Sequence, residues 1–201
     1  MTNNHYFTND QNLSSNRQTF SYQLRGFDLQ FISDEGVFSK KTVDFGSRLL
    51  IETFELPELT GKVLDVGCGY GPIGLGLAKD FSDREIEMVD VNLRALALAK
   101  ENAALNNIQN VQIYESSVYD RVDVKNFAAI VSNPPIRAGK VVVHAILEEA
   151  YERLAPSGEL WIVIQKKQGG PSAARKMEQT FGNVEVVKKN KGYYIYRSIK
   201  A

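Results

Sequence analysis

The chain has little cysteine, little histidine and no long apolar run. Its single cysteine, Cys68, has no partner within the chain, so there is no disulfide framework and a reducing compartment is expected. The two histidines, His5 and His144, lie far apart without metal-ligand spacing, which predicts that there is no metal site. The N-terminus lacks an apolar signal region and no run approaches about 18 apolar residues, so we expect a soluble cytoplasmic protein with no membrane partner.

An excess charge of either sign is also missing. Lys plus Arg and Asp plus Glu number 24 each, so no overall field draws the chain to nucleic acid or to a membrane. The distribution is uneven, because residues 166–201 carry nine basic and two acidic side chains, whereas residues 80–126 carry five basic and nine acidic ones. The basic segment is either a solvated face or an edge that binds a polyanion.

The length of 201 residues, 43% of them apolar, predicts one domain with a single well-buried core. We expect residues 1–18 to be flexible and residues 19–201 to form the domain. Within it, residues 19–60 are expected to form a hairpin, a lid and a helix, and residues 61–201 to form the core. The lid is expected over the carboxyl end of the first core strand, where open α/β sheets bind ligands.

Residues 63–74, with the sequence VLDVGCGYGPIG, are the most informative stretch. The apolar run that ends at Val66 predicts a strand buried on both faces of a parallel sheet. A helix is expected to begin near Pro72, because the first helical position needs no N–H partner. The glycine turn between them lets a ligand approach the backbone at the positive end of a helix, as nucleotide-type cofactors require.

Two classes of cofactor use such a turn. Residues 69–74 match the GxGxxG pattern of dinucleotide enzymes, and Asp90 is placed to bind a ribose in either class. Asp65 favours the other class, since a fixed carboxylate repels a pyrophosphate but attracts the ammonium and sulfonium groups of S-adenosylmethionine. The alternative is that Asp65 only orders an ordinary turn.

Apolar periodicity predicts strands and helices in alternation after this turn. Strands are expected at 86–89, 111–114, 128–132, 160–164, 184–187 and 193–199, and helices at 93–105, 143–154 and 172–180, after a hairpin at 19–33 and a helix at 43–54. The short connection 188–192 makes the last two strands a hairpin, so one strand must be antiparallel. The predicted fold class is α/β, with a Rossmann-like, mostly parallel sheet flanked by helices.

The chain resembles class I S-adenosylmethionine-dependent methyltransferases, and among them the small single-domain relatives of the RsmC group of 16S rRNA guanine-N2 methyltransferases. The resemblance is carried by residues 63–74, by GVFS at 36–39, by VDFGS at 43–47 and above all by NPPIRAGK at 133–140. It implies seven strands in the order 3-2-1-4-5-7-6 with strand seven antiparallel. It also implies S-adenosylmethionine as the cofactor.

The resemblance places Asp65, Gly67 and Gly69 around the amino acid end of the cofactor, Asp90 on the ribose, and Ser117 and Val118 at the adenine. Relatives often have Asp or Asn where Ser117 stands, although a serine hydroxyl can also accept a hydrogen bond. The full set of predicted cofactor-binding residues is Asp65, Gly67, Cys68, Gly69, Gly71, Asp90, Val91, Ser117, Val118 and Asn133.

The predicted catalytic residues are Asn133, Pro134 and Pro135. An exocyclic amino group is a poor nucleophile, because its lone pair is delocalised into the base. The Asn133 side-chain oxygen and the Pro134 carbonyl can accept hydrogen bonds from its two N–H groups and aim the nitrogen at the methyl group. The two prolines have fixed φ and no N–H, so they hold this turn rigid. The alternative is an ordinary turn at the end of a strand.

Substrate contacts are predicted for Phe38, Ile136, Arg137 and Lys140. Related amino-methylating enzymes usually have an aromatic residue where Ile136 stands, so stacking on the target base must come from elsewhere. Phe38 is the candidate, unless it packs beside the cofactor. Arg137 and Lys140 either contact phosphates or face solvent.

Three functions are compatible with these residues. The first is methylation of guanine N2, most simply in small-subunit rRNA, with RNA as the partner of a monomer or homodimer. The second is methylation of a protein glutamine or a small-molecule amine, and the third is a non-catalytic cofactor- or RNA-binding module. The basic C-terminal hairpin with Tyr193, Tyr194 and Tyr196 favours RNA, although alternating tyrosines also pack sheets.

Overall fold

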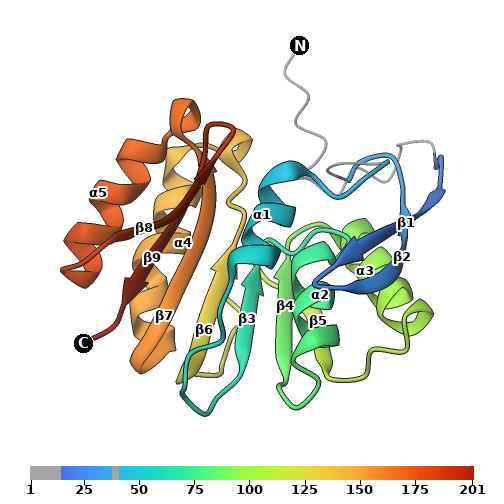
Figure 1. The fold of residues 1–201 in the computed structure, drawn as a ribbon, viewed down its shortest axis with the longest axis horizontal. Helices are drawn as coiled ribbons and strands as arrows, with labels where there is room; N and C mark the ends of the chain where they lie inside the picture. Colours follow the sequence, from blue (N-terminus) through green and yellow to red (C-terminus); the bar gives the residue numbers. More distant parts are fainter. Residues whose placement is uncertain (1–14, 38–40) are drawn as a thin grey trace.

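The computed structural model describes residues 15–37 and 41–201. A seven-stranded sheet lies between two layers of helices, and a two-stranded hairpin stands beside it (Figure 1). The strand order of the sheet is β5-β4-β3-β6-β7-β9-β8. Numbered from β3, this order is 3-2-1-4-5-7-6, and β9 runs antiparallel to both of its neighbours. The predicted fold class and topology are therefore confirmed.

The hairpin consists of β1 (Gln18–Leu24) and β2 (Phe27–Ser33), and the strands of the sheet are β3 (Val63–Val66), β4 (Ile86–Asp90), β5 (Val111–Glu115), β6 (Phe127–Ser132), β7 (Leu154–Gln165), β8 (Glu185–Asn190) and β9 (Tyr193–Ile199). The helices are α1 (Phe45–Thr53), α2 (Pro72–Asp80), α3 (Leu93–Leu105), α4 (Lys140–Arg153) and α5 (Gly170–Phe181), with short 3-10 turns at Ile136–Ala138 and Lys166–Gln168. The described helices and strands thus include every one expected from the sequence.

The central strands of the sheet are buried on both faces, as their continuous apolar sequences require. All four residues of β3 and all six of β6 are buried. Side chains from α1, α2 and α3 pack on one face, where Leu75 and Trp161 are buried. Side chains from α4 and α5 pack on the other, around Leu64 and Leu147. The two cores hold the central strands rigidly, so the residues at their ends have fixed positions.

The hairpin turns at Arg25 and Gly26, both of which have positive φ angles, +50° and +83°. This is the backbone that two-residue hairpin turns favour. The hairpin packs against α2 and α3 and does not cover β3. The segment after it approaches the strand ends instead, because the Asn92 side chain donates to the Gly36 carbonyl at 3.0 Å and the Tyr70 hydroxyl to the Thr42 carbonyl at 3.4 Å.

Among the boundaries that differ from the sequence prediction, those of β7 and β8 change the most residues of the sheet. Strand β7 begins at Leu154 rather than near residue 160, because 154–158 continues along β6 through an irregularity between Phe127 and Ala129. At the other end, β8 extends to Asn190, since Lys191 and Gly192 alone make the turn with φ angles of +47° and +80°. Lys188 and Lys189 therefore lie on a strand, not in a loop.

Candidate active site

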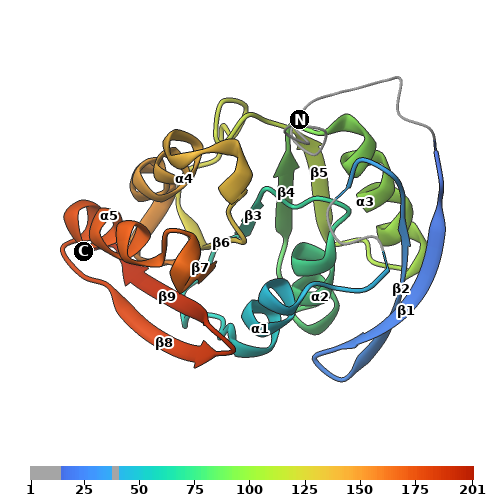
Figure 2. The ribbon, with the colours of Figure 1, turned by 90° about the horizontal axis from the view of Figure 1, so that it is seen from above.

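The candidate site lies where the carboxyl ends of β3, β4 and β6 meet. Parallel pairing aligns Val66 with Val89 and Asp65 with Val131, so the three chains leave the sheet side by side. Figure 2 views the molecule from this edge, where α1 approaches the ends of β3 and β6. Asp65, Asp90 and Asn133 are thereby brought to one edge, which is where open α/β sheets bind ligands.

Asp65 is fully buried and only half satisfied. One carboxylate oxygen, Oδ2, accepts the N–H of Gly74 at 2.9 Å and so caps the first turn of α2. The other, Oδ1, is buried without a hydrogen-bond partner among the described residues. Burial, together with the nearby charge of Asp90, raises the pKa of Asp65 to about 7. An unpaired buried carboxylate oxygen is unfavourable and suits a cationic ligand.

The glycine turn has an open side and a packed side. Gly67 and Gly69 have positive φ angles of +76° and +58°, and a Cβ atom on either would meet nothing within 4 Å. At Gly71 a Cβ would lie 2.9 Å from Leu75, so this glycine serves packing at the start of α2. Cys68 is buried, and burial raises the pKa of its thiol, which makes it a packing residue. The open side of the turn can therefore receive a ligand.

Asp90 lies at the end of β4 and is ordered by backbone donors. Its oxygens accept the N–H of Gly69 at 2.8 Å and of Asn92 at 2.9 Å. Burial raises its pKa, while these two donors and the N–H of Val91 act in the opposite direction. Because each carboxylate oxygen can accept more than one hydrogen bond, Asp90 retains capacity for the two hydroxyls of a ribose.

Ser117 and Val118 form the turn after β5. Ser117 is exposed, and Val118 is half-buried with a φ of +51°. The neighbouring Ser116 closes this turn, because its buried hydroxyl donates to the Val118 carbonyl at 3.1 Å and accepts the N–H of Arg121 at 3.1 Å. Sequence reasoning missed Ser116, and the adjacent serines were the available signal. Its role leaves the Ser117 hydroxyl available to a ligand.

Asn133 is held by helix α1. Its Nδ2 donates to the Ser47 hydroxyl at 3.0 Å and to Asp44 Oδ1 at 3.3 Å. Asp44 is also the N-cap of α1 and accepts the N–H of Ser47 at 3.1 Å. These bonds fix the amide, and its Oδ1 accepts no hydrogen bond from any described residue. The motif at 43–47 was noticed in the sequence, but the role of Asp44 and Ser47 was missed.

The residues after Asn133 form a compact turn. The Pro135 carbonyl accepts the N–H of Ala138 at 2.9 Å, whereas the Pro134 carbonyl accepts nothing from the described part of the chain. Pro134 is buried, and Ile136 packs partly against the core beneath α4. Arg137 and Lys140 are exposed, and neither forms an ion pair with a described residue. Phe38 lies outside the described residues.

The sequence predicted neither a metal site nor a membrane-spanning helix. Over residues 15–37 and 41–201, no three His, Cys, Asp or Glu side chains are grouped as metal ligands would be. No helix in the same ranges is long and apolar enough to cross a bilayer. His144 instead contacts the hydroxyl of Ser172 at 3.1 Å, and burial with the nearby Lys140 and Lys176 lowers its pKa.

Several known proteins resemble this chain. It is 60% identical to the uncharacterized protein YbxB of Bacillus subtilis, over 98% of each chain. It is 38% identical to the ribosomal RNA small subunit methyltransferase C of Vibrio vulnificus, over 90% of this chain and 52% of that protein. The chain thus spans about half the length of such relatives.

Solved structures that resemble this chain are also methyltransferases. The T. thermophilus 16S rRNA N2 G1207 methyltransferase RsmC, in complex with AdoMet and guanosine, superimposes with a TM-score of 0.80. The match has 28% identity and covers 92% of this chain and 51% of that one. A methyltransferase from Pyrococcus furiosus, 22% identical with a TM-score of 0.64, shares the fold. The model of the methyltransferase small domain matches residues 28–197, so the chain belongs to that family.

Proposed function

We propose that the protein transfers the methyl group of S-adenosylmethionine to guanine N2 in small-subunit rRNA. The observation that carries the proposal is the arrangement of Asn133, whose Nδ2 is held by Ser47 and Asp44 while its Oδ1 has no partner among the described residues. A fixed acceptor at the end of β6 beside an open glycine turn is what directed methylation of an amino group requires.

The residues at the strand ends fit S-adenosylmethionine. The unpaired Oδ1 of Asp65 would face the cationic amino acid end, and the open side of Gly67 and Gly69 would receive that part of the molecule. Asp90 would accept the ribose hydroxyls, and Ser117 would lie at the adenine. When bound, the cofactor supplies an electrophilic methyl group on a sulfonium. No phosphate-binding cation is needed at this turn, which suits this cofactor better than a dinucleotide.

In the reaction, Asn133 and Pro134 orient the nucleophile. The amide Oδ1 of Asn133 and the carbonyl of Pro134 accept hydrogen bonds from the two N–H groups of the target amine. This turns the nitrogen lone pair toward the methyl group and stabilises the positive charge that develops on nitrogen during transfer. Both acceptors are preorganised, since Asn133 is fixed by α1 and Pro134 is buried in a turn closed by the Pro135 carbonyl.

Support for RNA as the substrate comes from relatives and from charge. Two of the proteins that the chain resembles are named as ribosomal RNA methyltransferases, and the structure of one of them holds guanosine. In this chain, Arg137 and Lys140 are exposed beside Asn133, and residues 166–201 are strongly basic. A phosphate backbone is the partner that such a concentration of basic side chains favours.

The test is methyl transfer to the cell's own substrates. Ribosomal subunits, free RNA and protein are separated from a strain that lacks the gene and incubated with the enzyme and tritiated S-adenosylmethionine. We expect the label in 16S rRNA, released as N2-methylguanosine on digestion, and a rate of labelling roughly 10²–10³-fold lower with the Asn133→Ala variant. Label confined to protein or to small molecules would replace RNA by another amine, and no label with any fraction would contradict the proposed activity.

A further inference from the structure

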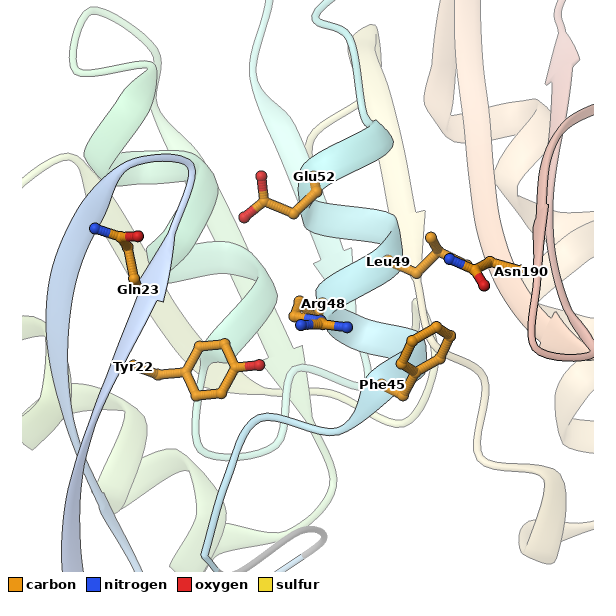
Figure 3. Close-up of a pocket in the computed structure, with 7 residues that line it drawn as sticks. All are labelled: Tyr22, Gln23, Phe45, Arg48, Leu49, Glu52 and Asn190. Atoms are coloured by element: carbon orange, nitrogen blue, oxygen red, sulfur yellow. The ribbon is translucent and has the colours of Figure 1, made fainter.

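Helix α1 has a second face beside the one that holds Asn133. Asp44 and Ser47 hold Asn133, whereas Phe45 and Arg48 follow one residue later in each case and so face about 100° around the helix. That second face borders a groove of about 420 Å³ between the β1–β2 hairpin and the tip of β8 (Figure 3). The groove is lined by Tyr22, Gln23, Phe45, Arg48, Leu49, Glu52 and Asn190. No residue of the glycine turn contributes to it.

Two cations lie against the ring of Phe45, which lines this groove. The guanidinium of Arg48 and the ammonium of Lys191 each lie 5.2 Å from the centre of the Phe45 ring. The ring of Tyr193 packs on Phe45 at 5.4 Å. Gly46 makes this approach possible, because a Cβ there would lie 2.9 Å from Tyr193. Helix α1 and the β8–β9 turn therefore build one cluster, which we call the Phe45 cluster (Phe45, Arg48, Lys191 and Tyr193).

The charges of the Phe45 cluster are not neutralised. Arg48 and Lys191 form no ion pair with a carboxylate among the described residues, whereas Arg25 is paired with Asp80 at 2.5 Å and Lys62 with Glu87 at 3.0 Å. The cluster is also anchored, since the N–H of Lys166 donates to the Gly192 carbonyl at 2.9 Å. An aromatic ring restrains a cation without cancelling its charge, so both groups remain available to an anion.

We propose that the Phe45 cluster binds the phosphodiester backbone of the RNA next to the target nucleotide. This inference rests on the proposed function and adds to it the side from which the strand reaches Asn133. Arg48 suits a phosphate because its planar fork can donate two hydrogen bonds, and Lys191 adds a second positive charge. Tyr22, half-buried on the opposite wall, offers a ring on which a flanking base stacks.

The charged residues around the Phe45 cluster define the path of the RNA backbone over the protein. Glu52 lies at the end of the groove nearest the hairpin turn, where its carboxylate accepts the N–H of Arg25 at 2.8 Å. A carboxylate repels phosphate, so the backbone runs along the side of Phe45 and Lys191. Continuing that way, the strand meets Lys189, which lies 5.2 Å from the ring of Tyr194 and has no carboxylate partner in the described chain. RNA thus crosses α1 toward the C-terminal hairpin.

The experiment compares charge-removal variants with a matched control. Arg48→Gln keeps a good helix former, and Lys191→Asn suits the positive φ of the turn. The control is Lys125→Gln, an exposed lysine in the loop before β6 and so at the opposite edge of the sheet. Binding of 16S rRNA fragments is measured at several salt concentrations, with KM and kcat for methyl transfer and the affinity for S-adenosylmethionine.

We expect the Arg48→Gln/Lys191→Asn double variant to bind RNA about tenfold more weakly and to reduce the slope of log K against log salt by between about one and two. KM for RNA should rise, while kcat and cofactor affinity stay within about twofold. Phe45→Leu, which keeps both charges, should give a smaller loss of binding. The Lys125→Gln control should match the wild type in each measurement.

Two outcomes would overturn the inference and are distinguishable. If the wild type methylates RNA and the double variant keeps its affinity and salt slope, the cluster only packs α1 against β9 and the proposed function stands. If the wild type binds S-adenosylmethionine but methylates no RNA, the proposed function fails first. Should the double variant unfold, Arg48→Lys alone decides, because it keeps the charge but removes the fork, and unchanged RNA affinity would then refute the assignment of Arg48.

Discussion

Asn133 Nδ2 and Ser47 Oγ are 3.0 Å apart, although 86 residues separate them in the chain. This bond ties the end of β6 to the first turn of α1. Together with Asp44, it decides which atom of the amide faces outward, because Nδ2 is engaged and Oδ1 is left open. The chemistry proposed for Asn133 therefore depends on a helix outside the sheet.

Replacing Asn133 separates catalysis from binding. Asn133→Ala removes one acceptor for the target amino group but leaves Asp65, Asp90 and the glycine turn intact. We expect methyl transfer to fall by roughly 10²–10³ while cofactor affinity stays within about threefold. Asn133→Asp keeps an acceptor oxygen and should retain more activity than Ala. Wild-type rates in both variants, measured by single-turnover transfer, would reduce Asn133 to a turn residue.

Ser47→Ala tests the positioning of that amide. The variant removes the 3.0 Å bond but no atom that would touch the substrate. We expect kcat to fall about three- to tenfold with KM and cofactor affinity nearly unchanged, because only the direction of Oδ1 is loosened. Ser47→Thr restores the hydroxyl and should recover most of kcat. A thermal unfolding curve for each variant separates this effect from a loss of stability.

Cofactor choice is tested by calorimetry with S-adenosylmethionine and NAD. We expect binding of the first only, because the Asp65 carboxylate would oppose a pyrophosphate. Asp90→Ala should weaken S-adenosylmethionine binding by roughly 1.5–3 kcal/mol, the usual contribution of hydrogen bonds to a charged group. Binding of NAD alone would contradict the cofactor assignment, and unchanged affinity in Asp90→Ala would remove Asp90 from the ribose.

Asp65 predicts an unusual dependence of stability on pH. Its pKa is about 7 in the folded protein against an ordinary value of 3.8, so the folded state binds the proton more strongly between these values. The contribution of Asp65 to the free energy of unfolding is therefore greatest at low pH, falls as pH rises toward 7 and is constant above it. Urea denaturation should show a loss of about 2–3 kcal/mol between about pH 5 and about pH 8 that is absent in Asp65→Asn. Equal slopes in both proteins would contradict the raised pKa.

Gly74 is predicted to be intolerant of a side chain. A Cβ at this position would lie 2.6 Å from Cγ of Met88, which is fully buried. Overpacking outweighs the better helix propensity of alanine, so Gly74→Ala should lower the free energy of unfolding by about 1–2 kcal/mol. Gly76→Ala is the matched control on the same helix, since its Cβ would meet Ile51 at 3.3 Å, and it should be close to neutral.

Sequence was sufficient for the elements whose signals are local. Helix α3 begins and ends at the predicted residues, because Asn92 caps it through a 3.1 Å bond to the N–H of Ala95 and an alanine-rich run follows. The glycine turn was equally visible, since a buried strand, glycines and a proline occur in sequence. The edge at which Asp65, Asp90 and Asn133 meet follows once the strands are parallel.

The partners of these residues depend on tertiary packing and were not predictable in the same way. Nothing local in VDFGS shows that Asp44 and Ser47 meet Asn133, because the contact exists only when the N-terminus of α1 reaches the residue that follows β6. The unpaired oxygen of Asp65 is likewise a property of burial. The prediction of a connecting loop at 188–192 was partly wrong. The turn consists of Lys191 and Gly192 alone, so Lys188 and Lys189 lie on β8.

The amides of Asn102 and Asn106 make α3 a substitute for a third strand of the hairpin. Asn102 accepts the N–H of Ile32 at 2.7 Å and Asn106 that of Gln30 at 2.8 Å, and each donates back to the carbonyl of the same residue. The spacing of the two asparagines along the helix, about 6 Å for four residues, is close to the spacing of Gln30 and Ile32 along the strand, about 6.8 Å for two residues. The otherwise open edge of β2 is thus closed to other chains.

Asn102 also donates to the carbonyl of Tyr70 at 3.0 Å, so one side chain joins β2 to the glycine turn. A ligand that orders the glycine turn should therefore also restrict the motion of β2. Amide hydrogen exchange at Gln30 and Ile32 should slow when S-adenosylmethionine binds, which gives a readout of cofactor occupancy at a strand outside the glycine turn.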